Sequence, residues 1–290
     1  MLLRYAADRR SIAFMIITTT IFIIQWYLTD INYLLYSISL FFSVAVAIMA
    51  HNHNHLPMWK KKYLNVITDY WLTLFYGFPA FGWIPTHNKN HHFYNNKSGD
   101  YTITYRCSEK NNMATLMSYP SISSFHQQKP IADYLKMLFK TNRTDFYGAI
   151  FQYVALGVLY ILAFYFNWHK AIILILIPHQ FSLISILIFN YVQHVHADEE
   201  SDINHSRNFV GPMLNAFLFN NGFHTVHHDR AGTHWSLTPD LHKKVADKID
   251  PVLNQKSFWG YMIRAYVLGI FSKKFKTDSM RLRRLNINQS

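Results

Sequence analysis

The chain has 290 residues, of which 50% are hydrophobic, 17% aromatic and only 15% charged, and its formal net charge is +12. This composition excludes a disordered chain, and the single cysteine, Cys107, excludes a disulfide-stapled scaffold. The positive charge suits a nucleic acid, an anionic membrane surface or an acidic partner, and the 17 histidines need a separate explanation.

Four apolar segments without Asp, Glu, Lys or Arg follow one another along the chain. Residues 11–29 and 33–51 form one pair with a short link, and residues 146–166 and 171–192 form a second pair. Each segment is close to the roughly 20 residues that a helix needs to cross about 30 Å of hydrocarbon. The sequence therefore predicts four transmembrane helices arranged as two hairpins.

The basic residues are distributed unevenly around these segments. Of the 28 lysines and arginines, 27 precede the first segment, lie between the second and the third, or follow the fourth, and Lys170 is the exception. The positive-inside rule assigns such regions to the cytoplasm. We therefore expect a multi-pass integral membrane protein, in the inner membrane of a bacterium or the endoplasmic reticulum of a eukaryote. Topology accounts for the charge, and we expect no nucleic acid partner.

Two further apolar stretches, residues 66–85 and 257–275, make the number of spans less obvious. The first contains Asp69, Gly77 and Pro79 and is rich in aromatic side chains, which favours a helix in the membrane plane. We interpret both stretches in this way, although hydropathy alone leaves a fifth span open. The chain shows no repeat and no long linker. We expect one domain, 1–290: an all-α membrane protein with both termini cytoplasmic, whose segments 52–145 and 193–290 form a helical cap.

The histidines are clustered at spacings of about one helical turn, so that neighbours in a cluster share a helix face. All four clusters lie on the predicted cytoplasmic side, either at the ends of the second and fourth apolar segments or in the cap. They are His51 and His55; His87, His91 and His92; Asn190 with His194; and His224, His227 and His228.

Imidazole nitrogen binds iron, copper, zinc and nickel, so ligand type alone does not choose the metal. A tetrahedral zinc site takes four ligands, and neither an HExxH motif nor a cysteine pair is present. Nine clustered histidines exceed one such site. They predict two metal ions with open positions for oxygen, held at the cytoplasmic side of the membrane.

The order HxxxH, HxxxHH, NxxxH and HxxHH, together with two helical hairpins, resembles the membrane fatty-acid desaturase and hydroxylase superfamily. Residues 219–236, FNNGFHTVHHDRAGTHWS, are similar to the third histidine box of bacterial fatty-acid desaturases, and the resemblance covers roughly residues 10–240. The resemblance implies an O2-dependent oxidoreductase that introduces a double bond into a fatty acyl chain. It also implies a non-haem di-iron centre, with two Fe held by all nine clustered histidines, and a water on one iron held by Asn190.

Ligating imidazoles need partners for their second ring nitrogen, and nearby acids can supply them. The candidate acids are Asp100, Asp198, Glu199, Glu200, Asp202 and Asp229, with Asp100 and Asp229 singled out, and the sequence does not assign an acid to a ring. His53, His196 and His234 are candidates for the surroundings of the centre, His234 alternatively for a structural turn. The other histidines receive simpler interpretations. We expect a local hydrogen bond for His179, and surface positions for His126, His169, His205 and His242.

The boxes do not separate desaturation from acyl hydroxylation, from decarboxylation to a terminal alkene or from carotenoid oxygenation. A histidine-lined metal transporter is a remote alternative, because it needs ionisable groups within the spans and only His179 lies there. The acyl carrier also stays open between CoA, a carrier protein and a lipid.

The chain contains no GxGxxG motif and no HPGG haem motif. We therefore expect a separate electron donor, such as a ferredoxin, a cytochrome b5-like protein or a reductase. The basic residues of the C-terminal region are candidates for docking that donor or lipid headgroups. They are Lys243, Lys244, Lys273, Lys274, Lys276, Arg281, Arg283 and Arg284.

Overall fold

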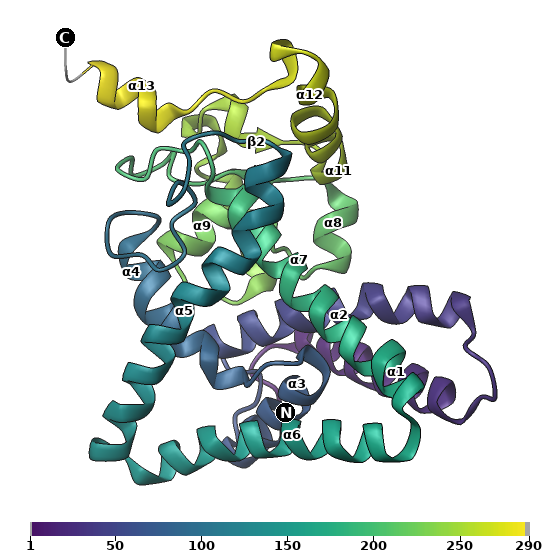
Figure 1. Cartoon of the computed structure of the whole chain (residues 1–290). Coiled ribbons are helices and arrows are strands. Elements are labelled where there is room, and N and C mark those ends of the chain that lie inside the picture. The colour runs from purple at the N-terminus through teal and green to yellow at the C-terminus, as the bar shows by residue number, and fades with distance from the viewer. Residues whose placement is uncertain (1, 288–290) are drawn as a thin grey trace. The chain divides into compact units, whose positions relative to one another are not determined.

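A computed structural model describes residues 2–287 of the chain, and helices dominate it (Figure 1). Within these residues the only paired strands are β1 (Asn208–Phe209) and β2 (Asn254–Gln255), which are parallel and two residues long. The predicted all-helical class is therefore confirmed. The chain divides into two compact units, Met1–His87 with Lys129–Ile186, and Asn88–Gln128 with Leu187–Ser290. The boundaries fall after His87 and within the long helices α5 (Met113–Thr141) and α7 (Ile177–His194).

The first unit contains α1 (Arg9–Tyr27), α2 (Tyr33–His55), α3 (Lys62–Tyr76) and α6 (Arg143–Ala171). Helices α1 and α2 lie side by side as a hairpin (Figure 1). The Gln25 side chain closes the link with two hydrogen bonds of 3.0 Å to the backbone N–H and C=O of Asn32. Asn32 also begins α2, because its Oδ1 accepts a hydrogen bond from the backbone N–H of Leu35 at 3.1 Å.

Three helical stretches of the described residues are long and apolar enough to cross a membrane: Ala6–Tyr27, Tyr33–His55 and Arg143–His194. The third has 52 residues, but Asn167 has non-helical backbone angles, with φ −160° and ψ 92°. The Asn167 side chain accepts a hydrogen bond from the N–H of Lys170, which begins a new helix.

The chain reverses its direction at Asn167. The Tyr160 hydroxyl lies 2.7 Å from His179 Nδ1, although 19 residues of straight helix would separate them by about 28 Å. Residues from both sides, among them Ala163 and Ile175, share one buried apolar cluster. The segments 146–166 and 171–192 lie on the two sides of this reversal, and the number of membrane crossings stays a prediction.

The two additional apolar stretches are interrupted and are not among the membrane-spanning candidates. Helix α3 ends at Gly77, and a 3-10 turn (Ala80–Gly82) and a π-helical segment (Ile84–His91) follow it. The other stretch forms α11 (Phe258–Met262), a π-helical segment (Ile263–Leu268) and α12 (Gly269–Phe271). Neither stretch supports a fifth span, and their lying in the membrane plane remains a prediction.

His179 joins three parts of the first unit through its ring. Its Nε2 donates to the carbonyl of Leu74 at 2.9 Å, so its Nδ1 accepts from the hydroxyl of Tyr160. The ring is buried, and this arrangement confirms the local hydrogen bond expected for His179. Gly77 packs directly against the base of this side chain with a φ of +83°.

Changing Gly77 to alanine is expected to destabilise the protein by about 2 kcal/mol or more. The added Cβ would overlap the Cβ of His179, and the positive φ is unfavourable for any residue with a side chain. Thermal unfolding of the purified protein in detergent measures the effect. Gly157→Ala is the control, because nothing lies within 4 Å of its new Cβ. Equal unfolding temperatures for the two variants would contradict the contact.

The second unit consists of shorter elements around a core of aromatic side chains. Its remaining helices are α4 (His92–Tyr94), α8 (Pro212–Phe217), α9 (His224–Asp229), α10 (Thr238–Lys243) and α13 (Met280–Ile287). Short 3-10 turns occur at Trp235–Leu237, Ala246–Lys248, Pro251–Leu253 and Lys273–Phe275, with another in the first unit at Ala6–Asp8. Phe209 of β1 is fully buried against Phe258 and Tyr261. This core supports the end of α7 and the helix α9, which carry histidines of the candidate site.

Candidate metal centre

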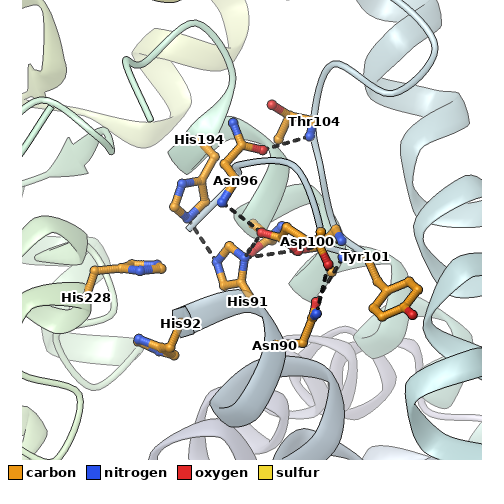
Figure 2. Close-up of polar contacts among 12 residues, drawn as sticks. Asn90, His91, His92, Asn96, Asp100, Tyr101, Thr104, His194 and His228 are labelled. Atoms are coloured by element: carbon orange, nitrogen blue, oxygen red, sulfur yellow. Dashed lines mark hydrogen bonds and ion pairs between the residues drawn. The ribbon is translucent and has the colours of Figure 1, made fainter. Parts of the chain in front are cut away.

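Four histidines of the second unit direct their Nε2 atoms toward one another. The Nε2 atom of His194 lies 2.9 Å from that of His224 and 3.1 Å from that of His91. The Nε2 of His228 lies 3.2 Å from that of His224. All four ligand atoms lie within 4.8 Å of one another, and Figure 2 shows His91, His194 and His228 around this point.

Three separate parts of the chain supply these four rings. His91 ends the π-helical segment Ile84–His91, and His194 ends α7. His224 and His228 are both on α9, one helical turn apart, so they share one face of that helix. His91, His194 and His224 are buried, and His228 is partly buried.

The spacing of these nitrogens fits a bound metal ion. With metal to nitrogen distances of about 2.0–2.1 Å, neighbouring ligand atoms are about 2.9 Å apart in octahedral and about 3.3–3.4 Å apart in tetrahedral coordination. The Nε2 to Nε2 separations of 2.9–3.2 Å agree with these values. The four residues therefore suit a metal site by ligand type, spacing and burial.

Asp100 fixes the ring of His91. Its Oδ2 lies 2.8 Å from His91 Nδ1, and the two side chains are almost completely buried (Figure 2). A carboxylate accepts a hydrogen bond here, so the proton of His91 is on Nδ1 and the lone pair is on Nε2, which faces His194. Asp100 thereby leaves His91 in the form that binds a metal.

The surroundings of Asp100 keep it ionised. Its oxygens also accept from the backbone N–H of Asn96 at 2.8 Å, and from the backbone N–H and the hydroxyl of Thr102, each at 2.7 Å. Burial alone would raise the pKa of Asp100. The hydrogen bonds from His91 and Thr102 oppose this effect, and the pKa is lowered.

His228 is kept neutral by its environment. Burial is the largest cause, and the neighbouring His92 and His224 add to it, so that the pKa of His228 lies well below its ordinary value. A neutral imidazole is the form that binds metals. His228 therefore need not lose a proton before a metal binds.

The other clustered histidines are also near one another within each unit. In the first unit, the nitrogens of His51, His55 and His87 lie within 4.8 Å of one another, and the Nε2 atoms of His51 and His87 are 2.8 Å apart. In the second unit, the Nε2 atoms of His92 and His227 are 3.0 Å apart. Their service as metal ligands stays a prediction.

Comparison with known proteins gives one match. The model of the fatty acid desaturase family matches residues 31–259, which is more than half of the chain and contains all four histidine clusters. The chain belongs to the fatty acid desaturase family. No curated protein and no solved structure matches it.

Membership in this family confirms the resemblance stated from the histidine boxes. The protein is therefore an oxidoreductase of fatty acid metabolism, and the family implies a fatty acyl substrate, O2 and a membrane environment. A special closeness to bacterial desaturases stays a prediction.

Asn190 is the first member of a short chain of hydrogen bonds. Its Nδ2 donates to the hydroxyl of Tyr119 at 2.6 Å, and that hydroxyl donates to the carbonyl of Thr102 at 2.7 Å. Tyr119 lies on α5, and no sequence motif singles it out. That Asn190 holds a water on one iron stays a prediction.

The three histidines expected around the centre, His53, His234 and His196, each make their own local contacts. His53 is buried, accepts from the N–H of Met58 at 3.3 Å and lies 3.6 Å from Asp69. His234 accepts from the N–H of Ser236 at 3.2 Å and begins the 3-10 turn Trp235–Leu237, which agrees with the structural turn. His196 donates from Nε2 to the carbonyl of Glu109 at 2.8 Å.

Two surface predictions are wrong for this desaturase family member. His205 is 3% exposed, because its Nε2 lies 3.2 Å from the Asp229 carboxylate and its ring packs 5.6 Å from that of His228. His242 is 5% exposed and packs against Phe223. Asp229 is thus next to His205, a histidine that adjoins the cluster.

Arg207 is another residue beside the candidate centre that no sequence motif singles out. It is almost fully buried, and its Nη1 donates to the carbonyls of Val192 and Val195, on either side of His194. The guanidinium lies 4.7 Å from the ring centre of Tyr261. A cation at the carboxyl end of a helix is favourable. Arg207 therefore fixes the backbone that carries His194, a role that its place among the predicted cytoplasmic charges does not indicate.

Proposed function

We propose that this member of the fatty acid desaturase family is an O2-dependent fatty acyl desaturase that uses two irons to introduce a double bond into an acyl chain. The observation that carries the proposal is the convergence of four imidazole nitrogens, with one ring oriented by a buried carboxylate. The family favours iron as the metal, and nine histidines are more ligands than a single zinc site takes.

The proposed ligands are the nine clustered histidines. His91, His194, His224 and His228 would hold one iron, which their spacing supports. The remaining five are proposed to complete the ligand set of the two irons: His51, His55, His87, His92 and His227. Asn190 is proposed to hold a water on one iron. These five ligands and this water are assigned from the family resemblance.

Bound iron supplies the activation of O2 that the removal of hydrogen from an unactivated methylene requires. The residues of the chain prepare the site for this chemistry. Asp100 keeps the His91 proton on Nδ1, and Arg207 holds the end of α7. Both interactions fix ligand orientation before a metal binds.

We further propose four spans, with both termini and the active site in the cytoplasm. The reversal at Asn167 supports two spans within Arg143–His194, and the position of 27 of 28 basic residues supports the orientation. A separate electron donor completes the proposal. Lys243, Lys244, Lys273 and Lys274 are exposed and available for docking, whereas Arg281 and Arg284 bind internal acids.

Expression in a host that lacks its own desaturase tests the reaction. We expect new mono-unsaturated acyl chains by gas chromatography and mass spectrometry of the total fatty acids. The same host expressing His224→Ala is the control and should contain none. Hydroxy acids or 1-alkenes in place of unsaturated chains would contradict desaturation and favour the alternative reactions of the superfamily.

A further inference from the structure

Helix α13 lies near the C-terminal end of the described chain (Figure 1). Two of its arginines form ion pairs with the loop that follows α7. Arg281 forms ion pairs with Glu199 and, at 3.2 Å, with Glu109. Arg284 forms ion pairs with Glu199 at 2.9 Å and with Asp198 at 2.7 Å. Two basic residues three positions apart on one helix face therefore hold three acids.

Glu199 is the centre of this network. Its side chain is only 2% exposed, and both arginines reach its Oε1. A buried carboxylate is costly unless cations and hydrogen bonds compensate its charge. Arg281 and Arg284 of α13 supply the cations that compensate the charge of Glu199.

A second set of contacts reaches the residues next to His194. The N–H of Met280 donates to the carbonyl of His196 at 3.2 Å, and Thr277 Oγ1 donates to His196 Nδ1 at 2.8 Å. The other ring nitrogen of His196 donates to the carbonyl of Glu109. His196 has a φ of 63°, a left-handed conformation that needs support from its surroundings. This support comes partly from the C-terminal segment, two residues after a candidate metal ligand.

We propose that α13 is a strap that positions His194 for metal binding, with Arg281 and Arg284 as positioning residues that act through the loop 195–200. The proposal rests on the proposed metal centre and adds a role for the C-terminal region. In this role the two arginines form ion pairs within the protein, whereas Arg283 on the same helix is exposed. The centre is then sensitive to changes more than 80 residues along the chain from His194.

Titration of the purified full-length protein with Co(II), in detergent and without reductant or substrate, tests the strap. The variant carries Arg281→Gln and Arg284→Gln, and the control is Arg283→Gln. We expect the double variant to bind Co(II) about tenfold more weakly, the lower end of what partners of metal ligands contribute, and to change its visible absorption spectrum. Hydrogen exchange of residues 195–200 should increase in the double variant and remain unchanged in the control.

Two further variants keep the test decisive if the double variant loses its fold. The pair Arg281→Lys and Arg284→Lys retains the charges and should recover most of the affinity. Thr277→Val leaves every ion pair in place and should shift the spectrum in the same direction. Wild-type affinity and spectrum in both the glutamine double variant and Thr277→Val would overturn the strap.

The outcome for the wild type separates this inference from the proposed function. A wild type that binds no Co(II) overturns the metal centre, and with it the strap. A wild type that binds Co(II), but whose iron-loaded form yields no unsaturated product, overturns the desaturase reaction. The strap then still stands or falls with the comparison of the variants.

Discussion

Replacing His194 with alanine is expected to reduce product formation at least about 100-fold and to lower the bound iron from about two to about one per chain. The ring of His194 lies between those of His91 and His224, with Nε2 distances of 3.1 and 2.9 Å. Its removal takes away the ligand that is close to both neighbours. Losing a partner of a metal ligand already costs about 10- to 100-fold in affinity or activity, and the loss of a ligand costs more. Fatty acid analysis and metal analysis of the same preparation measure the two effects.

His169→Ala is the matched control for this experiment. His169 is exposed and lies in none of the four clusters, so its removal should change neither the product nor the iron content. Full activity of His194→Ala, with iron still at about two per chain, would contradict the assignment of the ligand. Labile zinc without oxygen consumption in the wild type would instead favour the transporter alternative.

Changing Asp100 to asparagine is expected to weaken metal binding about 10- to 100-fold and to lower the free energy of unfolding by about 3 kcal/mol. Both carboxylate oxygens accept hydrogen bonds, from His91, Asn96 and Thr102. An asparagine has only one acceptor oxygen, so its NH2 group must face at least one of these donors. His91 also loses the charge that favours its proton on Nδ1.

Thermal unfolding without metal separates the loss of stability from the loss of metal affinity. Asp240→Asn is the control, because Asp240 is exposed and pairs only locally with Lys243 on the surface of α10. It should leave both quantities unchanged. An Asp100→Asn variant with the metal affinity and stability of the wild type would show that the carboxylate does not orient His91.

Several features were predictable from the sequence because they depend on short spacing or on composition. Two histidines four positions apart share a helix face wherever that helix lies. Long uncharged segments likewise indicate membrane-spanning helices, because length and apolarity decide whether a helix can cross the bilayer. The four boxes and their order were therefore enough to predict the family, which the family match then confirmed.

The sequence could not predict which distant side chains become partners. Asp100 was one of several candidate acids, but no regular spacing assigns it to His91, nine residues away, and Tyr119 and Arg207 belong to no motif. The sequence predicts His205 and His242 at the surface, but both are buried. His205 contacts Asp229 and His242 contacts Phe223, and neither partner is a sequence neighbour. Such positions are determined by packing, which a local pattern does not encode.

The sequence by itself determined the family, the helical class and the residues available as ligands, because each is encoded in local spacing or composition. Tertiary structure decided which of these residues meet. His91 and His194 are 103 residues apart, and only the folding of the second unit brings their Nε2 atoms to 3.1 Å. It also decided that Asp100 orients one ring and that Arg281 and Arg284 bind internal acids, because charge count alone does not distinguish a buried ion pair from an exposed cation.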